Sequence, residues 1–542
     1  MAIGPLPVAA GLLAAVILGS CDRAPQDRRG AGDSTELRIP IDRDLQTLDP
    51  TAPRSLDIVS YNILRLVYEG LVEYHPVTLE VIPRAAESWS ISEDERTWSF
   101  RLRDDLVFSD DPCFESGKGR EATADDVKHS MERAIRRRRG LLGAVTAPRF
   151  EGFGPFLDRR ADEITGIRVT GPHSIELRLV RPEPSLLHHL ARPEWAVMPR
   201  EIDESPGEEE GGRCVLGTGP FRVASWIPAS EVLLVRREAY RRHDEAGERL
   251  PKFDAIRFLV TWNDERLYAL GESDVLYSYR REARGAAIPG DGAQEFLVPW
   301  LNTISLRFNF NSSHPVVHDR ELRHAVTLAV PRGGDQLHVP ARALLPPGLP
   351  GLEERRSGQV SDAERARSIV SRRAGPWGDE MPSLEVLFPP TDQSGGARLV
   401  DGLRAAGFEA SLTIVKSDEL RRLVEAGRGA LYRDGWVADY PEAENFLQLY
   451  HSGSSLNSGG YSSPEFDRLF EAMLGESDRD RRAALARRAE DQLIADSAAA
   501  FLRHERQLQL VSPRVAGWQE SCTNPINVCY FERLGLREPE GR

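Results

Sequence analysis

Two side chains of opposite charge stand six residues apart late in the sequence. Arg433 and Asp439 belong to the segment Leu431–Tyr440, which reads LYRDGWVADY. Six is an even number, so a continuous β-strand would place both side chains on one face. Because an unpaired buried ion costs much free energy, this guanidinium and carboxylate can hold a ligand carboxylate and a ligand ammonium in a dry cleft. The alternative is that Arg433 and Asp439 bond each other or neighbouring loops.

Aromatic and amide side chains accompany this pair. Trp436 and Tyr440 lie in the same segment, but strict alternation puts Trp436 on the face opposite Asp439. A pocket role for Trp436 therefore requires the strand to bend, and core packing is the alternative. Asn309 and Asn311 end another predicted strand, where their amides can bond a ligand main chain or stabilise the end of the strand.

Signatures of a catalytic or metal site are weak. The sequence has no G-x-S-x-G, and Leu508 stands where His504-Glu505 would need a second histidine for H-E-x-x-H. The 12 histidines are scattered singly apart from His188-His189, and five methionines argue against a soft-metal site. We therefore expect no metal and no cofactor. Abundant carboxylates leave a glycosidase pair open.

Length and charge narrow the class of protein. A chain of 542 residues predicts two or three domains. The hydrophobic share of 40% and the charged share of 28% are those of a globular protein. A formal charge of −14 argues against nucleic-acid binding and against electrostatic attachment to an anionic membrane.

The N-terminus has the features of an export signal. Val8–Leu18 is apolar and has the length of a signal-peptide core, too short to span a bilayer. It ends in Leu18-Gly19-Ser20-Cys21, which resembles the lipobox of bacterial lipoproteins. Asp22–Asp33 resembles a flexible tether. We expect residues 1–20 to be a signal peptide, Cys21 to carry lipid, and 21–33 to form a lipidated tether.

Four cysteines remain for an oxidising compartment, and none has CxxC spacing. Cys522 and Cys529 flank the turn signal Asn524-Pro525, so we predict that they form a disulfide. Cys113 with Cys214 is the remaining pair, although nothing in the sequence brings them together. Free buried thiols are the alternative.

Helical and alternating patterns are interleaved along the chain, which predicts an α/β protein with mixed sheets. Strands are predicted at 37–41, 98–102, 167–179 (a hairpin), 221–223, 232–235, 256–260, 304–310, 384–388, 409–414 and 507–511. Helices are predicted at 59–74, 122–135, 319–330, 361–373, 396–406 and 464–495.

The order and spacing of several blocks resemble the extracytoplasmic solute-binding proteins of family 5, which include oligopeptide-, dipeptide- and nickel-binding lipoproteins of ABC importers. The similarity covers about 37–536. The blocks are Leu48-Asp49-Pro50, Tyr68–Leu71 (YEGL), Pro83–Trp89 (PRAAESW), Ser92–Asp94 with Trp98–Arg103, Phe108–Asp110, Ala122–Val127, Gly217–Phe221 with Trp226, Asp319–Ala325, Gly435–Pro441 (GWVADYP) and Tyr461–Leu469.

The resemblance implies a two-lobed periplasmic-binding-protein fold of type II with an extra domain on one lobe. Lobe I would comprise 34–56, 183–298 and 509–542, the extra domain 57–182, and lobe II 299–508. Strands that cross near Val298-Pro299 and Leu508–Val511 would form the hinge.

The same resemblance implies a function and site residues. In peptide-binding members, the aspartate at the position of Asp439 holds the ligand α-amino group, and an arginine at the position of Arg433 takes the ligand carboxylate in some oligopeptide binders. The chain would then be a monomeric, non-enzymatic peptide-binding component of an ABC permease and ATPase complex. It would lie in the periplasm or cell envelope, held to a membrane by lipid alone. The alternatives are an exported peptidase or glycosidase, a binder of sugar, nickel or haem with this fold, and a sensor.

Overall fold

The computed structural model describes residues 35–52, 57–137, 149–204, 214–278, 292–352, 355, 357–373 and 383–537. The predicted signal peptide, the tether and Cys21 lie outside these residues. Within them, no helix combines the length and the apolar character needed to cross a bilayer.

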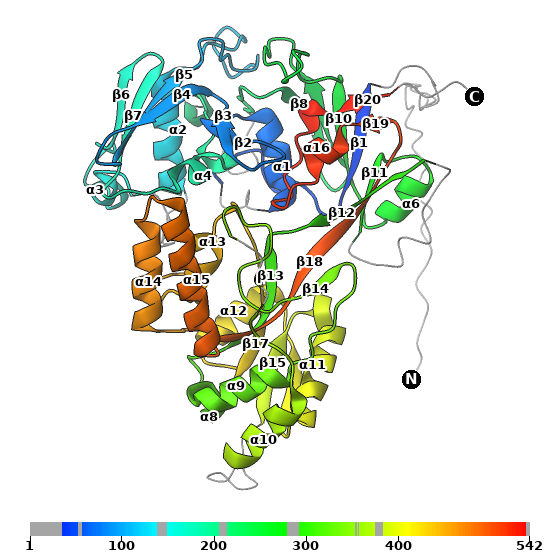
Figure 1. The fold of residues 1–542 in the computed structure, drawn as a ribbon. Helices are drawn as coiled ribbons and strands as arrows, with labels where there is room; N and C mark the ends of the chain where they lie inside the picture. Colours follow the sequence, from blue (N-terminus) through cyan, green and yellow to red (C-terminus); the bar gives the residue numbers. More distant parts are fainter. Residues whose placement is uncertain are drawn as a thin grey trace, which may run out of the picture. The chain divides into compact units, whose positions relative to one another are not determined.

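The first sheet joins the start of the described chain to its middle (Figure 1). Its order is β1-β10-β9-β8, with β1 parallel to β10 and the other neighbours antiparallel. The strands are β1 (Glu36–Ile41), β8 (Phe221–Ile227), β9 (Glu231–Arg236) and β10 (Ala255–Val260). Alternate side chains of β1 and β9 are buried, so the period-2 pattern correctly predicted these strands. We call the part of the chain built on this sheet lobe I.

A second, antiparallel sheet is inserted after helix α1 (Ile58–Val67) and has the order β4-β5-β7-β6. Its strands are β4 (Ala86–Ile91), β5 (Thr97–Leu102), β6 (Ile167–Gly171) and β7 (Ser174–Arg178), with α2 (Ala124–Arg137) against β6 and β7. A small hairpin, β2 (Val72–Tyr74) with β3 (Val81–Pro83), precedes it. The predicted helix 59–74 therefore ends early, because its last residues belong to β2.

The largest sheet has the order β11-β18-β13-β17-β15-β16. Its strands are β11 (Val275–Ser278), β13 (Asn302–Phe308), β15 (Leu384–Phe388), β16 (Ala410–Ile414), β17 (Leu431–Val437) and β18 (Ala499–Val511), and β12 (Gln294–Pro299) and β14 (His338–Pro340) also pair with β18. We call the part built on β13, β15, β16 and β17 lobe II.

β18 is long enough to belong to both lobes (Figure 1). Its first half pairs with β13, and its second half, up to Val511, pairs with β11 and β12. Val298 of β12 stands opposite Gln507. The strands that the sequence assigned to a hinge are therefore hydrogen-bonded neighbours.

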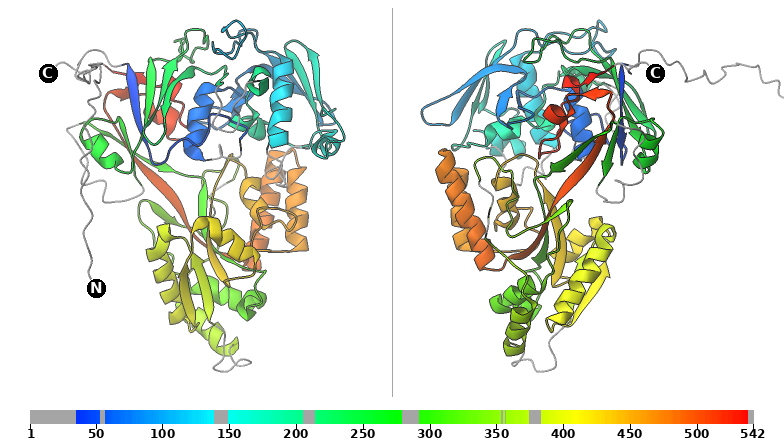
Figure 2. Two further views of the ribbon diagram at one scale, coloured as in Figure 1. Left: turned by 180° about the vertical axis from the view of Figure 1, so that it is seen from behind. Right: turned by 45° about the vertical axis from the view of Figure 1, so that its right-hand side comes forward.

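Helices complete lobe II (Figure 2). They are α8 (Pro315–His318), α9 (Arg320–Ala329), α10 (Ala363–Arg373), α11 (Gln393–Ala405), α12 (Ser417–Glu425), α13 (Glu444–Leu447), α14 (Pro464–Leu474) and α15 (Arg479–Ala495). α14 and α15 pack side by side. The single predicted helix 464–495 is thus two helices, because Gly475 caps the first and the Asp478 side chain caps the second.

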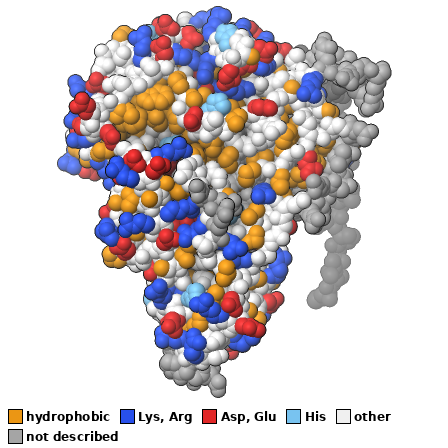
Figure 3. Space-filling model, in the orientation of Figure 1, with side chains coloured by type: hydrophobic (Ala, Val, Ile, Leu, Met, Phe, Trp, Pro, Cys, Tyr) orange, Lys and Arg blue, Asp and Glu red, His pale blue; other side chains and the backbone are white. Residues whose placement is uncertain are grey.

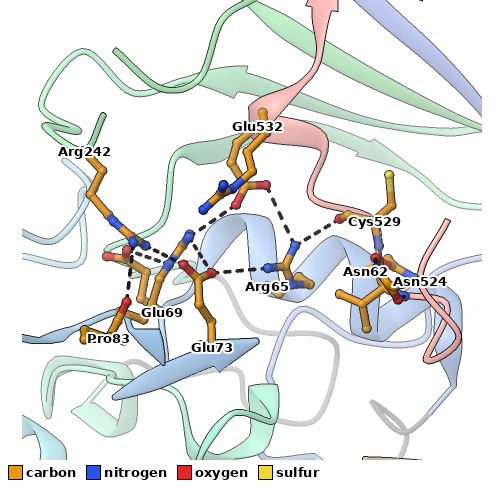
Figure 4. A network of polar contacts seen from close by, with 12 residues as sticks. Asn62, Arg65, Glu69, Glu73, Pro83, Arg242, Asn524, Cys529 and Glu532 are labelled. Atoms are coloured by element: carbon orange, nitrogen blue, oxygen red, sulfur yellow. Dashed lines mark hydrogen bonds and ion pairs between the residues drawn. The ribbon is translucent and has the colours of Figure 1, made fainter. Parts of the chain in front are cut away.

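A buried ionic network ties the C-terminal segment to α1 (Figure 4). Arg84 contacts Glu73 at 2.8 Å and Glu532 at 3.3 Å, and Glu532 has no exposed side-chain surface. Arg65 of α1 lies 3.5 Å from Glu73 and donates to the carbonyl of Cys529. The charges compensate one another inside the core, as buried ions must.

Both cysteine pairs within the described residues are bonded. Cys522 is bonded to Cys529, and Cys113 to Cys214 with a Cα–Cα distance of 6.0 Å. The second bond links the inserted region to lobe I across 101 residues. The described elements confirm the mixed α/β class. The predicted domain bounds stay a prediction.

Candidate functional site

Strand β17 has an edge that is unpaired over most of its length. β13 pairs with all seven residues, whereas β15 pairs only with the first two. The N–H of Ala438 donates to the carbonyl of Leu301 on the β13 side. Residues of a strand alternate in the edge that their main chain faces. The main-chain groups of Arg433, Gly435 and Val437 therefore face the edge that no described strand covers. Of these groups, the Gly435 N–H donates to the side chain of Asp434 at 2.9 Å.

Arg433 stands at one end of this edge with a weak internal partner. Its Nε lies 3.7 Å from Asp392 Oδ2, beyond hydrogen-bond distance, and this buried nitrogen has no hydrogen-bond partner among the described residues. Asp392 is held instead by Arg503 at 2.9 Å. Burial lowers the pKa of Arg433, Asp392 opposes that shift, and Arg503 adds to it. Because no described carboxylate lies within hydrogen-bond distance of it, the guanidinium can take up an anion.

Asp439 stands past the other end. β17 ends at Val437, so the continuous strand assumed in the same-face prediction is not observed. Asp439 Oδ2 lies 3.9 Å from Arg192 Nη1, while Arg192 Nη2 bonds Glu194 at 2.8 Å. The Asp439 side chain is 38% exposed and accepts no hydrogen bond from any described group. Its carboxylate is open to a cationic ligand.

Trp436, which alternation places on the face of β17 opposite Arg433, is held by a buried amide. Its Nε1 donates to Asn445 Oδ1 at 2.6 Å, and the same oxygen accepts the main-chain N–H of Asp439 at 3.2 Å. Asn445 is fully buried. Trp436 thus shares a positioning residue with Asp439. Its predicted contact with ligand stays a prediction.

The other three predicted contacts have internal partners. Tyr440 is buried, stacks against His188 and donates its hydroxyl to Glu444 at 3.0 Å. Asn309 is buried and donates to the carbonyls of Arg428 and Gly429.

Asn311 donates to the carbonyls of Val424 and Ser458. These contacts, like those of Tyr440 and Asn309, stabilise the surrounding turns and core, so the ligand roles of the three residues stay predictions.

Several residues of this site carry no signal in the sequence. Arg192 lies just before the short helix η3 (Pro193–Trp195), and Asp392 ends η5 (Pro390–Asp392). Only folding brings them to β17, since they are distant in the chain. The one sequence signal for Asn445 is its place four residues after the Gly435–Pro441 block, at the start of α13.

One group of described residues has metal-ligand proximity: Asp111, Cys113 and Cys214. The two sulfur atoms are bonded to each other, so they are not available as thiolate ligands. On the face shown in Figure 3, acidic and basic side chains are interspersed. This face therefore has no continuous basic patch of the kind that binds nucleic acids.

The geometry suits an extended zwitterion. Arg433 and Asp439 are six positions apart, so their Cα atoms lie at most about 20 Å apart. Between the two charges runs an unpaired strand edge of the kind that accepts an added strand. An extended peptide on the order of three to five residues long would bridge the two charges.

Comparison with known protein families identifies one that matches this chain. The profile of the bacterial extracellular solute-binding proteins, family 5 Middle, matches residues 80–458. The chain is 26% identical to the periplasmic oligopeptide-binding protein OppA of Escherichia coli (strain K12), covering 97% of both chains. It is 23% identical to the dipeptide-binding protein of the same organism, covering 87% of this chain and 89% of the relative.

Solved structures share the fold. The Escherichia coli murein tripeptide binding protein MppA superimposes with a TM-score of 0.75 at 22% identity, over 94% of this chain and 99% of that protein. The fold is therefore the two-lobed fold of periplasmic binding proteins, as the sequence predicted.

Proposed function

Since the chain belongs to family 5 of the bacterial extracellular solute-binding proteins, we propose that it captures peptides and delivers them to the permease of an ABC importer. Two relatives that match over most of its length are named for oligopeptide and dipeptide binding. We extend that ligand class to this chain, and we propose binding without turnover.

The observation that carries the proposal is the free edge of β17 with an under-compensated charge at each end. Arg433 has a carboxylate no nearer than 3.7 Å, and Asp439 has a cation no nearer than 3.9 Å, among the described residues. A peptide laid along the edge would satisfy its own main chain and both termini. Main-chain bonds tolerate many sequences, which suits a peptide importer.

Lobe closure around β12 and β18 would complete the site. Arg192 lies on the side of lobe I and the inserted region, because its neighbours Leu190 and Trp195 belong to the core that these two parts share. Asp439 follows a strand of lobe II. A ligand ammonium at Asp439 would therefore lie where the lobes meet, and its binding energy would favour the closed arrangement.

We further propose that the mature protein begins at lipidated Cys21 and works as a monomer at the cell envelope. The apolar run before Leu18-Gly19-Ser20-Cys21 supports this proposal. The domain scheme is proposed with it: lobe I at 34–56, 183–298 and 509–542, an extra domain at 57–182, and lobe II at 299–508.

Native mass spectrometry of protein purified without denaturation tests the ligand class. We expect peptides of a few residues to co-purify, to dissociate on unfolding and to be recovered uncleaved after incubation. Cleaved peptides would identify a peptidase. A bound sugar, metal chelate or haem in place of peptide would contradict the proposal.

A further inference from the structure

Both ligand-facing charges of the proposed site have the same arrangement of partners. Asp439 lies 3.9 Å from Arg192, and Arg433 lies 3.7 Å from Asp392. Each distance exceeds that of a hydrogen bond, yet each is short enough for electrostatic compensation.

Each counter-ion is also bonded to a third residue. Arg192 bonds Glu194 at 2.8 Å, and Asp392 bonds Arg503 at 2.9 Å. The Arg192 side chain is only 15% exposed, as is that of Asp392. Burial alone lowers the pKa of Arg192, but Glu194 and Asp439 outweigh burial and raise it. Arg192 is therefore a fixed cation.

We propose that Arg192 and Asp392 are standing counter-ions that set how strongly the site selects for charged peptide termini. Each offsets the charge that faces the ligand when no ligand is bound, and leaves its hydrogen-bonding atoms open. A ligand terminus then forms a hydrogen-bonded ion pair without first breaking one. This inference rests on the proposed peptide-binding function.

The standing charges also weaken terminal selectivity. Arg192 repels a ligand ammonium that approaches Asp439, and Asp392 repels a ligand carboxylate that approaches Arg433. Removing either charge should increase the affinity that is lost when the corresponding peptide terminus is blocked. The site would therefore become more selective, which is the opposite of what the loss of a direct ligand contact does.

The test measures two ratios of dissociation constants by calorimetry with one short peptide. The N-terminal ratio compares the N-acetylated peptide with the free peptide, and the C-terminal ratio compares the C-terminal amide with the free acid. We expect R192Q to raise the N-terminal ratio about two- to fivefold, the range of a partly exposed ion pair, and to leave the C-terminal ratio unchanged. D392N should do the reverse, so each variant is the matched control for the other.

Charge-retaining variants complete the design. R192K and D392E should keep both ratios near those of the wild type. D392N leaves Arg503 paired with Glu505 at 3.0 Å, so it tests the proposal even if R192Q fails to fold.

The outcomes separate this inference from the proposed function. Ratios above one in the wild type that neither R192Q nor D392N changes would overturn the standing counter-ions alone, and so would an equal loss of affinity for all peptides. If both ratios equal one in the wild type, the site does not recognise the charged termini of a peptide. That result would overturn the proposed binding of the termini and this inference together.

Discussion

Asn445 fixes the main chain of Asp439: its Oδ1 accepts the Asp439 N–H at 3.2 Å. The same oxygen accepts Trp436 Nε1, so one fully buried amide orients both residues. Replacing it with alanine leaves two donors without an acceptor. Each such loss costs about 1–3 kcal/mol when the donor is buried.

We therefore predict that N445A lowers the midpoint of thermal unfolding and weakens peptide binding beyond what the loss of stability explains. Because Asp439 would be displaced, the penalty for N-acetylating the peptide should shrink while the penalty for C-terminal amidation stays. Calorimetry on folded N445A measures both. If the two penalties shrink equally, Asn445 stabilises the whole site and does not specifically position Asp439.

Glu73 should make stability fall at acid pH. Burial alone raises its pKa, but Arg84, Arg242 and Arg65 outweigh burial and bring the pKa to about 2. A carboxylate with a depressed folded-state pKa stabilises the fold above its unfolded-state pKa. That contribution, on the order of 3 kcal/mol, is lost as the pH falls from about 4.5 towards 2.

E73Q should consequently lose stability at pH 7 and show a flatter pH dependence between those values. Urea unfolding at a series of pH values checks this. E87Q is a matched control, because the Glu87–Arg101 pair is exposed and should contribute little. A wild-type-like pH slope in E73Q would show that the acid sensitivity arises elsewhere.

The two disulfides should differ in their contribution to stability. By chain entropy, a bond closing a loop of about 100 residues is worth about 4.7 kcal/mol, and a much shorter loop is worth roughly 2–3 kcal/mol. C113S/C214S should therefore destabilise the protein more than C522S/C529S in chemical unfolding. Non-reducing peptide mapping of exported protein checks the pairing first, and free thiols at either pair would refute it.

Cys21 is predicted to become the lipidated first residue of the mature protein. Globomycin, or C21A, should leave unprocessed precursor on a denaturing gel. The motivation is the apolar run that ends in Leu-Gly-Ser-Cys. Soluble protein of mature size under either treatment would rule out the anchor.

Local patterns predicted most elements but not their partners. The alternation of Leu37–Ile41 identified β1, whereas nothing local identifies its parallel neighbour β10, which lies more than 200 residues later. Pairing at that distance depends on tertiary packing. The break between α14 and α15 was missed although Gly475–Arg482 contains no apolar residue and Asp478 is of a type that caps helices.

The candidate site was predicted only in part, because local sequence patterns do not show which distant residues meet in the fold. Arg433 and Asp439 lie in one readable segment, whereas Arg192 and Asp392 meet them only through contacts between distant residues. The expectation that a continuous strand carries both charges was wrong, since β17 ends at Val437.

The most direct test of the account is a four-cornered calorimetric cycle on Asp439. D439N is nearly isosteric, so the fold should survive while one partner of a desolvated charge pair is removed. We expect a loss of about 2–5 kcal/mol for a free peptide, or roughly 30- to several-thousand-fold in affinity. N-acetylation of the peptide should cost the wild type a similar amount and D439N little more, because both changes remove the same interaction. Additive losses, or unchanged affinity in D439N, would contradict the account and show that the peptide ammonium is held elsewhere.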